Sequence, residues 1–177
     1  MSSARARFGA ALRLAWRQIT HTWSYPLAHL IVLAVLFTTT QNTENLSAQA
    51  VLETIPGDIG IALASLAAIL LAGGSASRSP RAKFSELEQS FPGSSEVVLG
   101  RYCATFLAAL LFYVEPLLFA GLQGPLASFL VQMPIYLLEG SLAIALPVGL
   151  VWLLAHRSGL PTWSYPLLGM VWLGFFG

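Results

Sequence analysis

Four apolar segments dominate this sequence, and their length limits the fold more than any other feature. They cover roughly residues 25–40, 59–77, 102–122 and 126–155. A helix needs about 20 predominantly apolar residues to cross the hydrocarbon core of a bilayer. The chain is 56% hydrophobic and only 10% charged, with a mean hydropathy of +0.71, which is typical of a membrane protein. We therefore predict an all-α polytopic membrane protein with four transmembrane helices in a single domain.

The first of these four segments is short, and so is a fifth apolar segment near the C-terminus. The first is preceded by Trp23 and is bounded by Tyr25, two residue types that suit the interfacial aromatic belt of a span. A fifth apolar segment, residues 165–177, has too few residues to cross a bilayer. We expect the chain to be a fragment that stops inside its fifth span. The alternative is a re-entrant hairpin half.

The basic residues lie in three places, which a four-span topology puts on one side of the membrane. They precede the first span, separate the second from the third, and follow the fourth: Arg5, Arg7, Arg13, Arg17, Arg78, Arg81, Lys83, Arg101 and Arg157. The other connections carry Glu44, Glu53 and Asp58, with no Lys or Arg. Since cytoplasmic loops are enriched in Lys and Arg, we predict a cytoplasmic N-terminus.

The segment before the first span has the pattern of a basic amphipathic helix over residues 5–20. Its apolar residues recur at helical spacing, and its arginines fall away from that stripe. The apolar residues are Phe8, Leu12, Trp16 and Ile19, and the nearest arginines are Arg13 and Arg17. Such a helix tends to lie in the plane of the membrane interface, against the lipid bilayer. The alternative is a plain cytoplasmic extension of the first span.

A charged island, residues 78–101, separates the second and third spans, and its pattern predicts a short cytoplasmic helix over residues 79–91. Ser79-Pro80 reads as an N-cap followed by proline at the first helical position, and Pro92-Gly93 ends the helix. Phe84, Leu87 and Phe91 form one face; Arg81, Lys83, Glu86 and Glu88 occupy the remainder. Ser94-Ser95-Glu96 is then expected to cap the next helix. The alternative is a solvated linker along the headgroups.

This island carries a resemblance to a known family. The stretch Phe84-Ser-Glu-Leu-Glu-Gln-Ser-Phe-Pro-Gly-Ser-Ser-Glu-Val-Val-Leu-Gly-Arg-Tyr-Cys-Ala104 resembles the segment between the second and third spans of type-2 ATP-binding-cassette (ABC) transporter permeases. The residues that match the family pattern are Glu86, Leu87, Pro92, Val98, Leu99, Gly100 and Arg101. The chain departs from the family in having fewer than six spans, and in Phe91, where leucine is usual.

The resemblance implies a membrane subunit of a bacterial exporter in the inner (plasma) membrane. It implies that the 79–91 helix is a coupling helix that docks on a separate nucleotide-binding ATPase subunit through Arg81, Lys83, Phe84, Glu86, Leu87, Glu88 and Phe91. ATP and Mg would bind to that partner and not to this chain, and a second permease subunit, identical or different, would complete the transporter. The sequence accordingly contains no Gly-x-x-x-x-Gly-Lys-Ser/Thr phosphate-binding loop.

Two carboxylates fall inside predicted spans, Glu115 in the third and Glu139 in the fourth. Ionisable residues at that depth are costly, so we expect both to line a translocation route or to couple helices. Buried carboxylates also suit a gradient-driven secondary transporter, which is one alternative function. A haem-exporter permease of cytochrome maturation is another.

Other function classes are not supported. His21, His29 and His156 lack the His-Glu-x-x-His spacing of a zinc protease, and no Gly-x-Ser-x-Gly nucleophile motif occurs. We therefore predict neither catalytic nor metal-binding residues, and thus no enzyme. A net charge of +1 gives no reason to expect a nucleic-acid partner.

Overall fold

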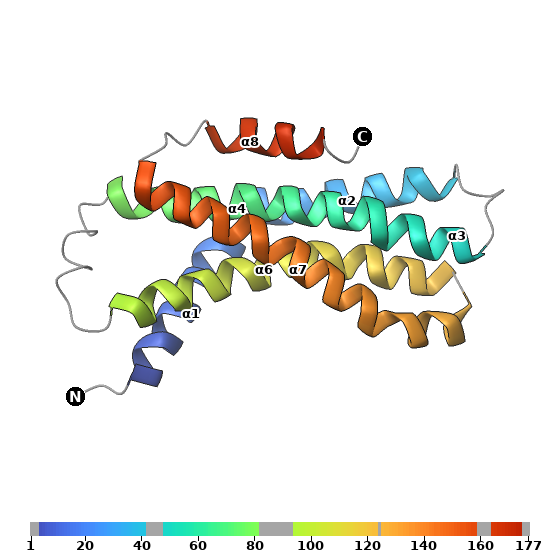
Figure 1. Cartoon of the computed structure of the whole chain (residues 1–177), viewed down its shortest axis with the longest axis horizontal. Coiled ribbons are helices and arrows are strands. Elements are labelled where there is room, and N and C mark those ends of the chain that lie inside the picture. Colours follow the sequence, from blue (N-terminus) through green and yellow to red (C-terminus); the bar gives the residue numbers. More distant parts are fainter. Residues whose placement is uncertain (1–3, 42–47, 82–93, 124, 159–163, 175–177) are drawn as a thin grey trace.

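The computed structural model describes residues 4–41, 48–81, 94–123, 125–158 and 164–174, and the elements found there are all helical (Figure 1). They are α1 (Ala4–Thr20), α2 (Ser24–Gln41), α3 (Ala48–Glu53), the π-helix η1 (Thr54–Gly60), α4 (Ile61–Arg81), α6 (Ser94–Gln123), α7 (Leu126–Ser158) and α8 (Ser164–Leu173). The long helices α4, α6 and α7 lie side by side, and α8 packs against α4. The predicted all-α class is thus confirmed.

Three helical stretches in the described part of the chain are long and apolar enough to cross a membrane. They are residues 54–74, 95–123 and 126–154. The pair α1 and α2 passes the same test only when taken together, and the two helices are bent by 63° at their junction. The described residues therefore hold three candidate spans, or four if the bent pair forms one, so the predicted four spans remain a prediction.

Of the two helix boundaries within the island, one agrees with the boundary predicted from the sequence and the other does not. Helix α6 begins at Ser94, with Glu96 in its first turn, as the capping pattern predicts. Helix α4 continues through Ser79 and Pro80 to Arg81, so the predicted helix start at Ser79 is wrong. Proline has a fixed φ close to the helical value, so the last turn of a helix can include it with the loss of one backbone hydrogen bond.

The predicted connection between the first two spans is also helical over much of its length. Helix α3 and η1 cover residues 48–58 of it and continue into the predicted second span, although Pro56-Gly57 is a turn signal. Ile55 and Pro56 are buried, and η1 packs against α6. Tertiary burial therefore overrides the local turn preference in this segment.

Small residues allow the helices to approach closely. Ala64, Ala68 and Ala72 follow one another at four-residue spacing along α4, and all three are fully buried. Gly73 faces the ring of Tyr165 on α8, where an added Cβ would lie only 2.3 Å from a ring carbon. Small-residue contacts are the usual means by which helices associate in lipid, because there is no hydrophobic driving force between them.

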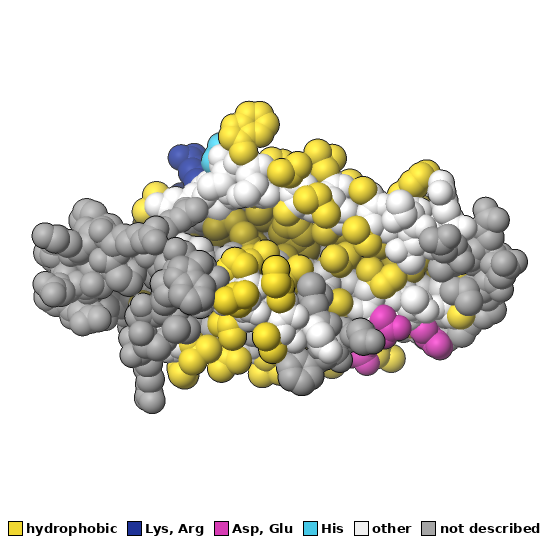
Figure 2. Space-filling model, turned by 90° about the horizontal axis from the view of Figure 1, so that it is seen from above, with side chains coloured by type: hydrophobic (Ala, Val, Ile, Leu, Met, Phe, Trp, Pro, Cys, Tyr) yellow, Lys and Arg dark blue, Asp and Glu magenta, His cyan; other side chains and the backbone are white. Residues whose placement is uncertain are grey.

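Charge is segregated along the bundle. Helix α1, the end of α4, the start of α6 and the end of α7 lie toward one end, and these are the elements that contain the described arginines. Helix α3 and η1, with Glu53 and Asp58, lie toward the other end. Figure 2 shows a face on which hydrophobic side chains cover the middle, with basic and acidic side chains toward opposite ends.

Candidate functional site

Glu115 of α6 pairs with His29 of α2 inside the bundle. The Nδ1 atom of His29 lies 2.6 Å from Oε1 of Glu115. The side chain of His29 is 17% exposed and that of Glu115 is 25% exposed, so both are mostly covered by protein. The second carboxylate oxygen, Oε2, is buried and has no hydrogen-bond partner among the described residues. Histidine is therefore the side chain that partners this carboxylate, which lies within a candidate span.

Aromatic rings enclose the pair. The imidazole of His29 stacks on Phe112 with a centroid distance of 4.0 Å and an interplanar angle of 4°. Tyr25 meets His29 edge-on at 4.5 Å, and its hydroxyl donates a hydrogen bond to the carbonyl oxygen of Ala108 at 3.1 Å. Tyr25 is buried here, so its ring contacts protein, and its place at a membrane interface stays a prediction. Trp23, by contrast, is 91% exposed.

The pair lies on the only buried stripe that the described side chains of α2 form. Tyr25, His29, Val32 and Leu36 recur at spacings of four, three and four, and they turn one face of α2 toward the bundle. Leu30, Ile31 and Phe37 on the other faces are exposed. The stripe therefore brings His29 against α6. Two groups within hydrogen-bond distance can share or exchange a proton.

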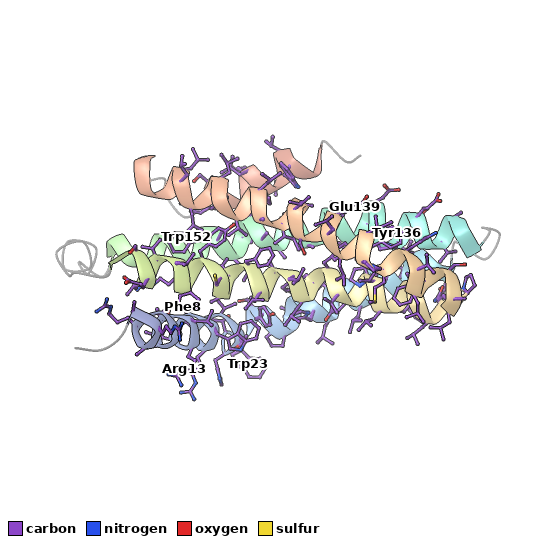
Figure 3. The ribbon with its side chains drawn as sticks, turned by 60° about the horizontal axis from the view of Figure 1, so that its bottom comes forward. Phe8, Arg13, Trp23, Tyr136, Glu139 and Trp152 are labelled. Atoms are coloured by element: carbon purple, nitrogen blue, oxygen red, sulfur yellow. The ribbon has the colours of Figure 1, made fainter. Side chains whose placement is uncertain are left out.

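Glu139 has a different setting. It lies near the middle of the 126–154 stretch of α7 and is exposed, between Ile135 and Leu142, which are also exposed. The hydroxyl of Tyr136, one turn earlier, donates to Oε1 of Gln132 at 3.1 Å. Figure 3 shows Glu139 and Tyr136 close together on α7, with Trp152 farther along the helix. Glu139 thus faces outward from a single copy of the chain.

Tyr113 packs directly behind this part of α7. It is fully buried, its hydroxyl has no hydrogen-bond partner among the described residues, and its ring lies against Gly140. A Cβ at Gly140 would come within 2.3 Å of that ring. The glycine therefore lets α6 and α7 approach closely next to Glu139.

The N-terminal helix packs on the first half of α6. Ile19 is buried, Leu12 and Trp16 are packed against the core, Phe8 is partly buried, and Arg13 and Arg17 are exposed. Gly100 of α6 lies against α1, where an added Cβ would be 2.9 Å from the carbonyl oxygen of Phe8. The apolar stripe of α1 is thus turned, at least in part, toward protein.

An ion pair joins the ends of these two helices. Nη2 of Arg7 donates to Oε1 of Glu96 at 3.3 Å. Glu96 lies in the first turn of α6, in the last part of the charged island. The N-terminal helix and the end of the island are therefore connected.

The predicted docking residues are mostly beyond what the structure describes. Arg81 is the last residue of α4, whereas Lys83, Phe84, Glu86, Leu87, Glu88 and Phe91 lie outside the described residues. From the sequence, His29 was considered only as a zinc ligand, and its pairing with Glu115 was not predicted. A histidine four residues after Tyr25 within an apolar segment was the available signal, because an ionisable group at that depth requires a partner.

Among the described residues there is no group of three or more His, Cys, Asp or Glu side chains placed to hold a metal ion. Comparisons of the chain with protein-family models, with curated proteins and with solved structures give no match. Its function therefore has to be inferred from its own residues and their geometry.

Proposed function

We propose that this chain is a membrane-spanning permease subunit of an ATP-driven exporter of the ABC class, with its N-terminus in the cytoplasm of a bacterial cell. A separate nucleotide-binding subunit would hydrolyse ATP, and its closure would move the 79–91 segment and thereby the spans attached to it. Rigid-body switching of this kind is a common transport device. The proposal covers the topology, the partners and the direction of transport.

The observation that carries the proposal is the convergence of the basic elements at one end of the bundle. Helix α1, the end of α4 and the start of α6 meet there, on either side of the charged island, and the Arg7–Glu96 pair links two of them. A docking segment there is joined through the chain to α4 and α6, and α6 packs on α1. Movement of the segment would therefore reach three helices, as coupling requires.

Glu139 supports a second permease subunit. A carboxylate in the middle of a candidate span is costly when it faces lipid, and such groups usually face protein or a water-filled cavity. In a single copy of the chain Glu139 is exposed. A second subunit placed on this face of α7 would bring Glu139 into a protein interface or a central path.

The test is co-purification with the ATPase. We expect the tagged chain to retain a subunit that has a phosphate-binding loop and an ABC signature, encoded by a neighbouring gene. Glu86→Lys with Glu88→Lys, or Phe84→Asp, should abolish that binding. Glu53→Lys, a charge reversal at the opposite end of the bundle, is the matched control and should leave binding intact. Stoichiometric binding by the island variants would remove the docking proposal.

The His29–Glu115 pair favours a second candidate, a gradient-driven secondary transporter. A histidine and a carboxylate 2.6 Å apart within the bundle have the chemistry of a proton relay. The two candidates differ in their energy source. Transport in sealed vesicles that needs ATP and survives a proton uncoupler supports the ABC permease. Transport that an uncoupler abolishes without any ATP requirement supports the secondary transporter.

A further inference from the structure

A groove runs between α1 and α6, and the His29–Glu115 pair does not line it. The groove has a volume of about 380 Å³. Its wall on α6 is formed by Leu107, Leu110, Leu111 and Val114, whose spacing places them on one face of the helix. All four belong to the 95–123 stretch that is apolar enough to cross a membrane. This wall therefore follows α6 into the candidate span.

The opposite wall, on α1, contains both apolar and basic side chains. Leu12 and Trp16 continue the apolar lining, whereas Arg13 and Arg17 are exposed and bring two positive charges to the same groove. Nε of Arg13 donates to the carbonyl oxygen of Gly9 at 3.2 Å, a bond within its own helix. Among the described residues, neither arginine forms an ion pair. The groove thus combines an apolar wall with two exposed cationic side chains.

The orientation of α1 suits a position at the membrane surface. Helix α1 is bent by 63° from α2. Figure 3 shows the side chains of Arg13 and Trp23 directed away from the bundle on the same side. Trp23 is 91% exposed, and tryptophan is enriched at the level of the lipid headgroups. Arg13 and Arg17 are therefore positioned to meet headgroups, with the apolar wall of α6 beyond them.

We propose that this groove is a binding site for one anionic phospholipid. The acyl chain lies along Leu107, Leu111 and Val114, and the phosphate group accepts hydrogen bonds from Arg13 and Arg17. A guanidinium binds phosphate with two parallel donors, so the pair of arginines matches the charge and the geometry of such a headgroup. A second protein copy fits less well, because it would bury two arginines and would have to supply their counter-charges. The proposal requires membrane insertion and does not depend on transport.

The experiment measures lipid competition on the full chain in detergent micelles by native mass spectrometry. Phosphatidylglycerol and phosphatidylcholine with identical acyl chains compete for the chain, so that only the headgroup differs. We expect the chain to retain phosphatidylglycerol in preference to phosphatidylcholine. Since a basic residue near an anionic lipid surface contributes about fivefold in affinity, Arg13→Gln and Arg17→Gln should each lower the preference about fivefold. The double variant should lower it about thirtyfold.

Two further variants make the result specific. Arg5→Gln removes the same charge from an exposed position of α1 that does not line the groove, and it should leave the preference within about twofold of the original. Leu111→Trp fills the apolar wall and should weaken the retention of both lipids. The site is disproved if Arg5→Gln matches the effect of Arg13→Gln, or if Leu111→Trp retains the lipid unchanged. It is equally disproved if the lipid-free chain forms a dimer whose interface shields Arg13 and Arg17 from solvent.

Discussion

Helix α6 is held to the N-terminal helices in two different ways. Along its first half it packs extensively on α1, and the Arg7–Glu96 ion pair lies at the edge of that contact. Farther along, α6 meets α2 through a sparse contact that contains the His29–Glu115 pair. The first contact is broad and apolar with a partly exposed ion pair. The second is narrow. The two carboxylates are about equally exposed, at 25% for Glu115 and 26% for Glu96, but His29 is 17% exposed where Arg7 is 37% exposed.

The difference between the two contacts indicates where a polar pair contributes most to helix association. Beside a broad apolar contact, an exposed ion pair contributes little, because solvent screens it and two long side chains lose conformational freedom. Within a narrow contact in the bundle, the partner of a partly buried carboxylate carries a large share of the association, because an unpaired charge there is expensive. We therefore expect the His29–Glu115 pair, and not the Arg7–Glu96 pair, to determine how α6 holds its neighbour.

The largest effect should come from His29→Leu, which leaves Glu115 without its partner. We expect the free energy of unfolding to fall by about 3 kcal/mol, the lower end for breaking one half of a buried pair. The measurement is equilibrium unfolding in mixed micelles with increasing dodecyl sulfate. The double variant His29→Leu, Glu115→Leu should recover most of the loss, because it removes both polar groups. An unchanged transition for His29→Leu would mean that apolar packing alone holds α2.

Gly100→Ala should have the next largest effect, at the α1–α6 contact. The added Cβ would lie 2.9 Å from the Phe8 carbonyl oxygen and 3.0 Å from the Leu12 nitrogen, and backbone atoms cannot rotate away. Overpacking of this kind costs about 2 kcal/mol. Gly149→Ala on α7 is the matched control, since nothing lies within 4 Å of the new Cβ. The control should leave stability unchanged or raise it by up to about 1 kcal/mol, because alanine favours the helix.

Arg7→Gln should lower stability by only about 0.5 kcal/mol, as expected for a partly exposed pair. The Arg7 and Glu96 side chains are 37% and 26% exposed. The same unfolding measurement at low and high salt provides the check, because added salt should shrink the difference between the variant and the original chain. A loss as large as that of His29→Leu would show that the two contacts of α6 do not differ in the way proposed.

Glu139→Gln should have the smallest effect on the stability of a single copy in micelles, within about 0.5 kcal/mol of no change, as for most surface substitutions. Its effect should appear instead in assembly or transport, if a second subunit covers this face. Size-exclusion chromatography with light scattering measures the assembly. If Glu139→Gln and Glu115→Gln both left assembly and transport as they were, the proposed role of these carboxylates would be wrong.

Much of the helical layout could be predicted from the sequence, because it depends on local length and composition. The segments predicted at 102–122 and 126–155 lie within α6 and α7, and the capping pattern at Ser94 marks the start of α6. The prediction was wrong at Ser79-Pro80 and gave no helix for residues 48–58. There, strong local signals for a cap and a turn competed with helix continuation and with burial against α6.

The sequence by itself determined that the chain is helical and apolar, that its basic residues gather at three places, and that two carboxylates fall within long apolar stretches. The tertiary structure alone decided what those carboxylates meet. His29 and Glu115 are 86 positions apart, and only the rotation of α2 and α6 against each other brings them within 2.6 Å. Glu139 is exposed because α7 turns that face away from the bundle. Local sequence sets where a helix begins and ends, but which face it buries depends on packing with every other helix.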